Sequence, residues 1–341
     1  MEVEAAIPPP ELRLNATLRK YALRTSQLGE NHPVRKELDK INLESRENSP
    51  ATRLERIKDT LRSIPRDIEK VDPFLYPPWA GYTPYNTEIS TLSKADAATE
   101  HLKALAEAPD NLIALYSDAS SLPQGMGIGV GVVLLDYSQS RDKIQVRATK
   151  NIGPNALVYN GELDGITTAL ELANKHGYKS KDIRVFADNQ AALLRLKHPN
   201  NTPGQWWQQR AIHAARQLRD RDNKVTVEWV PGHVNVHGNE EADRLAKQAT
   251  LIPPTTEDTS IAFYGMQLKE VLYNEWKSQL LSAPSSAYSK AFTWKIKRKL
   301  IAPTTVRETA SSFYQLKIGH GYFKSYLYRF NHVEDDRCYY S

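Results

Sequence analysis

The 341-residue sequence predicts an α/β domain in its middle part, a mixed five-stranded sheet with flanking helices, with helical extensions on both sides. Two observations predict this class. Short runs rich in Val, Ile and Gly alternate with segments of helical periodicity, and helices fall between later strands, as they do in sheets with parallel neighbours. The predicted domains are a connector with helical and Pro-rich segments at 1–110, the α/β domain at 111–250 and a basic helical region at 251–341.

The elements of the α/β domain can be placed in order. Three strands form an antiparallel meander, a helix follows, and a strand, two helices, a strand and a last helix complete the domain. The predicted segments are 111–119, 127–137, 143–152, 160–175, 182–189, 190–196, 206–220, 224–232 and 240–249. Because the first helix can serve as a crossover, we expect the first and fourth strands to be parallel neighbours. Further helices are expected at 12–28, 35–46, 266–281 and 287–300.

Composition excludes several classes of protein. The single cysteine, Cys338, cannot form an intrachain disulfide or a cysteine zinc cage. The acidic, proline-broken N-terminus carries no secretory signal, and the longest apolar run, 126–135, is about half of the roughly 20 residues that a membrane helix needs. The sequence therefore predicts an intracellular protein of the cytoplasm or nucleus that does not enter a membrane.

The excess of positive charge lies near the C-terminus. From Gly265 onward there are twelve Lys and Arg against six Asp and Glu, so the preceding residues hold 33 basic (45 − 12) and 34 acidic (40 − 6) side chains. A basic segment of this kind, with KIKRK at Lys295–Lys299, predicts contact with a polyanion. A solvated helical surface, or a docking surface for a polymerase, would have the same composition.

Four acidic residues are placed to converge. Asp118 and Asp188 end the two strands expected to be parallel, so both reach the carboxyl edge of the sheet. Glu162 and Asp243 come from the first turns of two helices. Four carboxylates at one edge repel one another by several kcal/mol unless a cation neutralises them. Individually, each has a simpler interpretation as a helix cap, a charge near a helix dipole or a surface residue.

An oxygen-rich ligand set of this kind suits Mg²⁺ or Mn²⁺ rather than Zn²⁺. Two Mg²⁺ ions about 4 Å apart would hold a phosphate, activate a water and stabilise the leaving oxygen. His233, in the loop after the last strand, is a candidate for proton transfer because an imidazole titrates near pH 6.5.

The middle region resembles a type 1 ribonuclease H. The resemblance rests on YSDAS, NGEL, ADNQAAL and PGHVNVHGNEEADRLAKQA, which occur in the family's order. It implies a ribonuclease H-like fold and an endonuclease that cuts the RNA strand of an RNA–DNA hybrid, leaving 5′-phosphate and 3′-hydroxyl ends. The metal ligands would be Asp118, Glu162, Asp188 and Asp243, and His233 would be the mobile proton-transfer residue. Gly161 departs from the family, where a larger residue is usual, and is expected to loosen the helix start.

The flanking segments LGENHPVRKEL and QLKIGHGYFKSYLYRF are similar to those around this module in fungal non-LTR (LINE-type) retrotransposon polyproteins. A reverse transcriptase, in cis or in trans, is therefore a candidate partner. The sequence has no YxDD polymerase motif, and His320, His332 and Cys338 do not complete a zinc site. The chain thus resembles a fragment of such an element or a gene derived from one.

Polar residues near the carboxylates are candidate contacts to the hybrid, whose recognition requires hydrogen bonds to sugars and minor-groove edges. They are Ser120, Asn160, Asn189, Gln190 and Asn239. Side chains of these types equally often bond to loop backbone. Trp206, Trp207 and nearby arginines such as Arg210 and Arg216 are candidates for the DNA backbone, or else one tryptophan fills the core and the arginines are solvated.

The sequence favours a metal-dependent hybrid ribonuclease. A non-catalytic nucleic-acid-binding or connector remnant of a retroelement polyprotein is the alternative. An integrase or resolvase of related fold is disfavoured by the GHxNxxGNEEAD motif.

Overall fold

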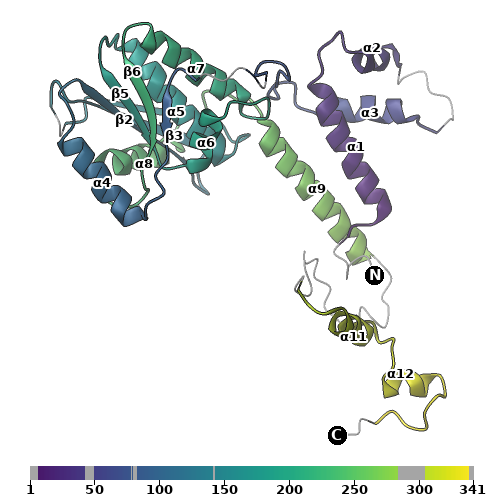
Figure 1. Ribbon diagram of the computed structural model, residues 1–341. Coiled ribbons are helices and arrows are strands. Elements are labelled where there is room, and N and C mark those ends of the chain that lie inside the picture. The colour runs from purple at the N-terminus through teal and green to yellow at the C-terminus, as the bar shows by residue number, and fades with distance from the viewer. Residues whose placement is uncertain are drawn as a thin grey trace. The chain divides into compact units, whose positions relative to one another are not determined.

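The computed structural model describes residues 7–42, 50–77, 79, 83–140, 143–282 and 304–337 (Figure 1). The chain divides into two compact units. One comprises Ala22–Gln267, and the other comprises Met1–Tyr21 with Leu268–Ser341. Within the described ranges, no helix combines the length and the apolar character needed to cross a bilayer.

The larger unit is built around a mixed six-stranded sheet of order β1-β6-β5-β2-β3-β4 (Figure 1). β1, β6, β5 and β2 are parallel, whereas β3 pairs antiparallel with β2 and β4 antiparallel with β3. The strands are β1 (Asn86–Glu88), β2 (Leu112–Ser121), β3 (Ile128–Asp136), β4 (Val146–Asn151), β5 (Asp182–Ala187) and β6 (Lys224–Trp229). The predicted α/β class and the predicted parallel pairing of the first and fourth strands, β2 and β5, are confirmed.

The sheet has one strand more than the five predicted. β1 lies in the region 1–110 that was predicted to be a connector, and it pairs with β6, with Asn86 opposite Thr226. Three residues are too few to show the alternation that identifies a strand, so the sequence carried no signal for it. β1 covers an edge of β6 that would otherwise be open to pairing with other chains.

Helices cover both faces of the sheet. One face carries α5 (Val158–Lys175), α6 (Gln190–Lys197) and α7 (Gln205–Arg219), and the other carries α4 (Lys94–Ala106) and α8 (His237–Ala249). Each layer encloses its own apolar core. Leu163, Ile166 and Leu170 of α5 are buried in the first core, whereas Leu172 is only partly buried. Tyr116 and Phe186 stack in the second core.

Glycines allow two of these helices to lie close to the sheet. A Cβ on Gly129 or Gly131 of β3 would lie 2.1 Å or 2.2 Å from a backbone carbonyl oxygen of α8. A Cβ on Gly161 of α5 would lie 2.7 Å from Cβ of Ala119. Gly161 was expected to loosen the start of its helix. Its position instead shows that close packing against β2 and β3 leaves no space for a side chain there.

The remaining helices include those predicted in the extensions. The larger unit contains α2 (Pro33–Lys40) and α3 (Arg53–Arg62). The smaller unit contains α11 (Arg307–Ile318) and α12 (Lys324–Arg329). The residues of α1 (Pro10–Ser26) and of α9 (Ile261–Ser282) are divided between the two units. In the smaller unit, Arg19 of α1 forms an ion pair with Glu275 of α9. The helix predicted at 287–300, and with it Lys295–Lys299, lies outside the described residues.

Glu69 joins segments from both flanks to the sheet domain. Its carboxylate accepts hydrogen bonds from the backbone N–H of Gly204, just before α7, at 2.5 Å, and from that of Ile261, the first residue of α9, at 3.3 Å. Ile68 also bridges to Thr259. One half-buried carboxylate thus satisfies N–H groups at the start of two helices, a position that favours negative charge.

We expect Glu69→Ala to lower the free energy of unfolding by about 2 kcal/mol, because backbone N–H groups at two helix ends lose their acceptor. The measurement is the urea midpoint followed by tryptophan fluorescence. Asp67→Ala is the matched control, since the Asp67 side chain is exposed two residues away. Equal losses in the two variants would show that the carboxylate of Glu69 does not stabilise the fold.

Candidate active site

The site lies at the edge of the sheet where the parallel strands end. β2 and β5 pair as far as Ser117 opposite Ala187, so Asp118 and Asp188 are the next residues along the chain after this last pair. Asp188 follows β5 directly, as predicted. Asp118 does not end its strand, because β2 continues to Ser121 through its pairing with β3. The two carboxylates nevertheless leave the β2–β5 ladder at the same level.

Glu162 reaches this edge from α5. The helix begins at Val158, two residues before the predicted start, so Glu162 lies in its second turn rather than its first. Three carboxylate oxygens, one each from Asp118, Glu162 and Asp188, lie within 4.8 Å of one another. A second group, with the same limit on its ligand atoms, consists of His233, Glu240 and Asp243.

The three clustered carboxylates oppose one another's ionisation. Burial, followed by the charges of Asp118 and Asp188, raises the pKa of Glu162 to about 9. Burial and the charge of Asp188 raise the pKa of Asp118 to about 7, against a hydrogen bond from the Ala119 N–H at 2.7 Å. Burial also raises the pKa of Asp188, and the charge of His233 is the leading opposing contribution. The protein alone therefore favours protonation of carboxyls that a cation would hold ionised.

The donor set fits a divalent cation. Glu162 is only 4% exposed, and its Oε2 has no hydrogen-bond partner within the described part of the chain. A buried, unpaired carboxylate oxygen is costly, so its presence calls for a partner. Carboxylate oxygens with at most one imidazole are the ligands of hard cations such as Mg²⁺ and Mn²⁺.

Gly131 brings Asp243 to the site. Gly131 is directly opposite Asp118 on the neighbouring strand, and opposite residues of an antiparallel pair face the same side. The missing side chain lets the carbonyl of Ala242, the residue before Asp243, approach the sheet to a position 2.2 Å from where a Cβ would be. The Asp243 carboxylate forms an ion pair with Lys247 at 2.6 Å, and its charge contributes to the raised pKa of Asp118.

His233 lies on an irregular loop beside Asp188. Its side chain is exposed, and the backbone φ angles of His233 and Asn235 are 59° and 60°, in the left-handed region that such residues rarely adopt. The preceding residue, Gly232, lies against the site, since a Cβ there would be 2.2 Å from Oδ2 of Asp188. The loop thus places an imidazole next to a carboxylate without blocking it.

The five predicted substrate contacts have different environments. Asn189 caps α6 by accepting the Ala192 N–H at 3.1 Å, and it opposes the raised pKa of Glu162 as a hydrogen-bond donor. Asn160 is buried, and its Oδ1 accepts the Leu157 N–H at 3.0 Å. Asn239 is also buried, but its Oδ1 has no partner among the described residues. Ser120 is half-buried and Gln190 is exposed.

The sequence analysis singled out neither Glu240 nor Gly232, both of which lie at the site. Glu240 precedes Asp243 by three positions on α8, a spacing that puts two side chains on one helix face, and this was the available signal. Nothing local distinguishes Gly232 from any other turn glycine, because its importance depends on Asp188, a residue of another strand.

The paired tryptophans have different surroundings. Trp207 is buried and its Nε1–H donates to Asp164 at 3.1 Å, whereas Trp206 is 46% exposed, with the Arg210 guanidinium 4.4 Å from a ring centroid. Arg210 is paired with Glu171 at 2.6 Å and with Asp164 at 3.1 Å. Its charge is therefore largely neutralised within the domain, whereas Arg216 is exposed.

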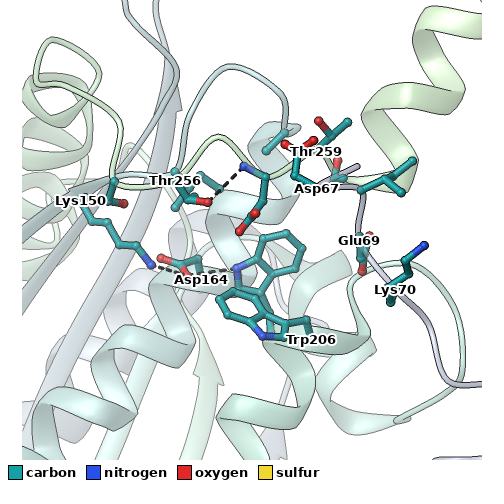
Figure 2. Close-up of a pocket in the computed structure, with 15 residues that line it drawn as sticks. Asp67, Glu69, Lys70, Lys150, Asp164, Trp206, Thr256 and Thr259 are labelled. Atoms are coloured by element: carbon teal, nitrogen blue, oxygen red, sulfur yellow. Dashed lines mark hydrogen bonds and ion pairs between the residues drawn. The ribbon is translucent and has the colours of Figure 1, made fainter. Parts of the chain in front are cut away.

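A cavity of about 460 Å³ opens beside these tryptophans, between the sheet domain and the segments around Glu69 and Thr259. Figure 2 shows Lys150 extended toward the carboxylate of Asp164 beside the indole rings, and Lys150 Nζ lies 3.0 Å from Asp164 Oδ1. None of the residues that line this cavity belongs to either of the two clusters at the sheet edge, the carboxylates of Asp118, Glu162 and Asp188 or the group of His233, Glu240 and Asp243.

Fold and site together define a mixed α/β domain whose sheet edge carries a carboxylate cluster suited to divalent cations. Residues 110–251 match the family model described as RNase H, so this part of the chain is an RNase H domain.

The chain is similar in part to several known proteins. The Pol polyprotein of equine infectious anemia virus (strain Wyoming) is 28% identical over 172 residues, which cover 49% of this chain and only 12% of that polyprotein. Among solved structures, the N-terminal RNase H domain of Rv2228c from Mycobacterium tuberculosis is 22% identical and covers 41% of this chain and 98% of that one, with a TM-score of 0.34. RNase H1 from Halobacterium salinarum is 27% identical and covers 40% and 96%, with a TM-score of 0.32.

Proposed function

We propose that this protein is an endonuclease that hydrolyses the RNA strand of RNA–DNA hybrids. One observation carries the proposal: a domain that matches the RNase H family model brings the carboxylates of Asp118, Glu162 and Asp188 within 4.8 Å, with a buried oxygen of Glu162 left unpaired among the described residues. Asp243 completes the ligand set from the facing helix. The enzyme is of the type 1 class, as the order of its motifs suggests.

The metal ligands in this proposal are Asp118, Glu162, Asp188 and Asp243. When bound there, two Mg²⁺ ions, or Mn²⁺ in their place, would polarise the scissile phosphate and lower the pKa of a water. The chain's own residues orient these ligands: Ala119 N–H holds Asp118, the Asn189 amide contacts Glu162, and the Trp229 Nε1–H donates to the backbone oxygen of Asp188 at 2.9 Å.

His233 is exposed beside Asp188, where it can accept and release a proton at the edge of the site. Ser120, Gln190 and Asn239 are proposed to contact sugars or base edges of the hybrid, together with Asn160 and Asn189. Asn160 and Asn189 also accept hydrogen bonds from backbone N–H groups of α5 and α6 or next to them. We therefore assign these two residues both a contact to substrate and a part in holding the helices at the site.

The cellular setting is proposed from the flanking motifs and from the partial similarity to a viral Pol polyprotein. The chain is a retroelement-derived module, of the fungal non-LTR kind that its flanks resemble, and works in the cytoplasm or nucleus beside a reverse transcriptase in cis or in trans. The segments at 1–110 and 251–341 serve as connector and basic helical region around the nuclease.

The purified protein should cut the RNA strand of a labelled hybrid in Mg²⁺, should stop cutting in EDTA, and should leave duplex RNA and duplex DNA intact. A His233→Ala variant should cut about 100- to 10,000-fold more slowly, because general acid–base catalysis by the imidazole is lost. Folded protein that binds the hybrid in Mg²⁺ without cutting it would contradict the proposal and would favour a non-catalytic binding module.

A further inference from the structure

Helix α4 starts at the same edge of the sheet as the carboxylates. β1 is parallel to β6, β5 and β2, so its carboxyl end points to the edge that carries Asp118 and Asp188. The chain leaves β1 at Glu88, and α4 begins at Lys94 with Ser93 as its N-cap. Three of these strands belong to the RNase H match, but β1 and Lys94 precede residue 110.

The direction of α4 is fixed by its contacts. His101 Nε2 lies 2.8 Å from the Tyr116 hydroxyl, and its ring packs edge-on to Phe186 at 4.6 Å, over the middle of the sheet. Past its end, the chain enters the amino end of β2 at Leu112. The helix therefore runs antiparallel to the strands, with Lys94 near the active edge and Lys103, in its last turn, toward the opposite edge.

The side chain of Lys94 is exposed, and no hydrogen bond or ion pair holds it among the described residues. Its positive charge nevertheless acts on the site. The ammonium of Lys94 has an electrostatic interaction with the carboxylate of Asp188. Lys94 is thus near enough to influence a carboxylate of the cluster and is still available to another anion.

We propose that Lys94 binds substrate, contacting a backbone phosphate of the nucleic acid beside the carboxylate cluster. The inference rests on the proposed function, since it assumes that a nucleic acid crosses this edge. A phosphate backbone laid over several carboxylates is repelled by them, and an unpaired ammonium on the same edge offsets that repulsion. Lysine acts here as a point charge, which suits contact with phosphate and not with a particular base. The segment before the RNase H match would then supply part of the binding surface.

The test compares Lys94→Ala with Lys103→Ala, a lysine of the same helix that is also exposed. Hybrid binding is measured by fluorescence anisotropy in Mg²⁺ over a range of salt concentrations, in a Glu162→Gln background in which we expect no cleavage. Loss of one phosphate contact should raise Kd about 3- to 10-fold and reduce the slope of log Kd against log salt by about 1. Lys103→Ala should change neither quantity, and Lys94→Arg should retain most of the binding.

Cleavage by the chain without the Glu162 change separates this inference from the proposed function. If that protein cuts hybrids but Lys94→Ala binds with the same Kd and salt slope as Lys103→Ala, the inference is overturned and the nuclease stands. If it does not cut, but only Lys94→Ala loses affinity and slope, the inference stands and the proposed activity fails. If the protein neither binds nor cuts, both are overturned.

Discussion

Replacing Glu162 by Gln should abolish hybrid cleavage and at the same time stabilise the metal-free protein. The expected loss of activity is at least about a thousandfold, equivalent to roughly 4 kcal/mol of transition-state stabilisation, because a ligand of the proposed cation is removed. The gain in stability has a separate cause. The Glu162 carboxylate is buried beside Asp118 and Asp188, and Gln carries no charge for them to repel.

The pH dependence of this gain follows from the raised pKa of Glu162, about 9 in the fold against 4.5 for an ordinary glutamate. Between these values the folded protein keeps a proton that the unfolded chain has released. The stabilisation from that proton is complete below about pH 4.5 and is lost as the pH rises through about 9. Glu162→Gln has no such loss, so at pH 9 in EDTA it should be more stable than the original chain by on the order of 3 kcal/mol.

Urea midpoints at pH 6 and pH 9 in EDTA, together with cleavage rates in Mg²⁺, measure both effects. Glu100→Gln is the control, because Glu100 is an exposed glutamate of α4. It should match the original chain in rate and in stability. If the urea midpoint of Glu162→Gln at pH 9 does not exceed that of the original chain, the electrostatic account is contradicted. If Glu162→Gln still cuts the hybrid at the original rate, Glu162 is not a metal ligand.

Gly131→Ala should destabilise the larger unit by about 3 kcal/mol or more and should greatly weaken cleavage. The new Cβ would stand 2.2 Å from the Ala242 carbonyl oxygen and 2.5 Å from the Ala246 nitrogen. These are backbone atoms of α8, so relief requires the helix to move away from the sheet. Asp118 lies on β2, directly opposite Gly131, so this movement of α8 would carry Asp243 away from Asp118.

The measurements are thermal unfolding and cleavage at a temperature where the variant remains folded. Gly265→Ala is a suitable control, since a Cβ at Gly265 would meet nothing within 4 Å. It should retain full activity and should lose no stability. Wild-type stability and activity in Gly131→Ala would show that α8 does not depend on this close approach.

The sequence predicted those parts of the fold that have a local period. The strands of the meander alternate or are rich in Val, and α5 repeats apolar residues at helical spacing, so each could be placed from a few neighbouring residues. Parallel pairing of β2 with β5 then brought Asp118 and Asp188 to one edge by geometry alone. The position of the carboxylates was therefore predictable before any distance was known.

Features that depend on contacts between distant segments were not predictable. β1 is a strand only because β6 pairs with it, and Glu69 caps a helix that begins far along the chain. Lys94 belongs to a helix that the sequence did not single out, and its nearness to Asp188 follows from the place of β1 in the sheet. In each case the residue type is common, and the role of the residue depends on a partner distant in sequence that no local pattern identifies.

The pairing of Asn86 with Thr226 also has a consequence for the order of folding. During synthesis β1 emerges early, together with Glu69, but their partners are made much later: Gly204 after α6, and β6 and Ile261 after α7. Closing so long a loop is slow compared with forming local helices and hairpins. We expect the meander and α5 to form first and β1 to pair last, so a chain halted before Lys224 would lack β6 and would expose the unpaired edge of β5 to its neighbours on the ribosome.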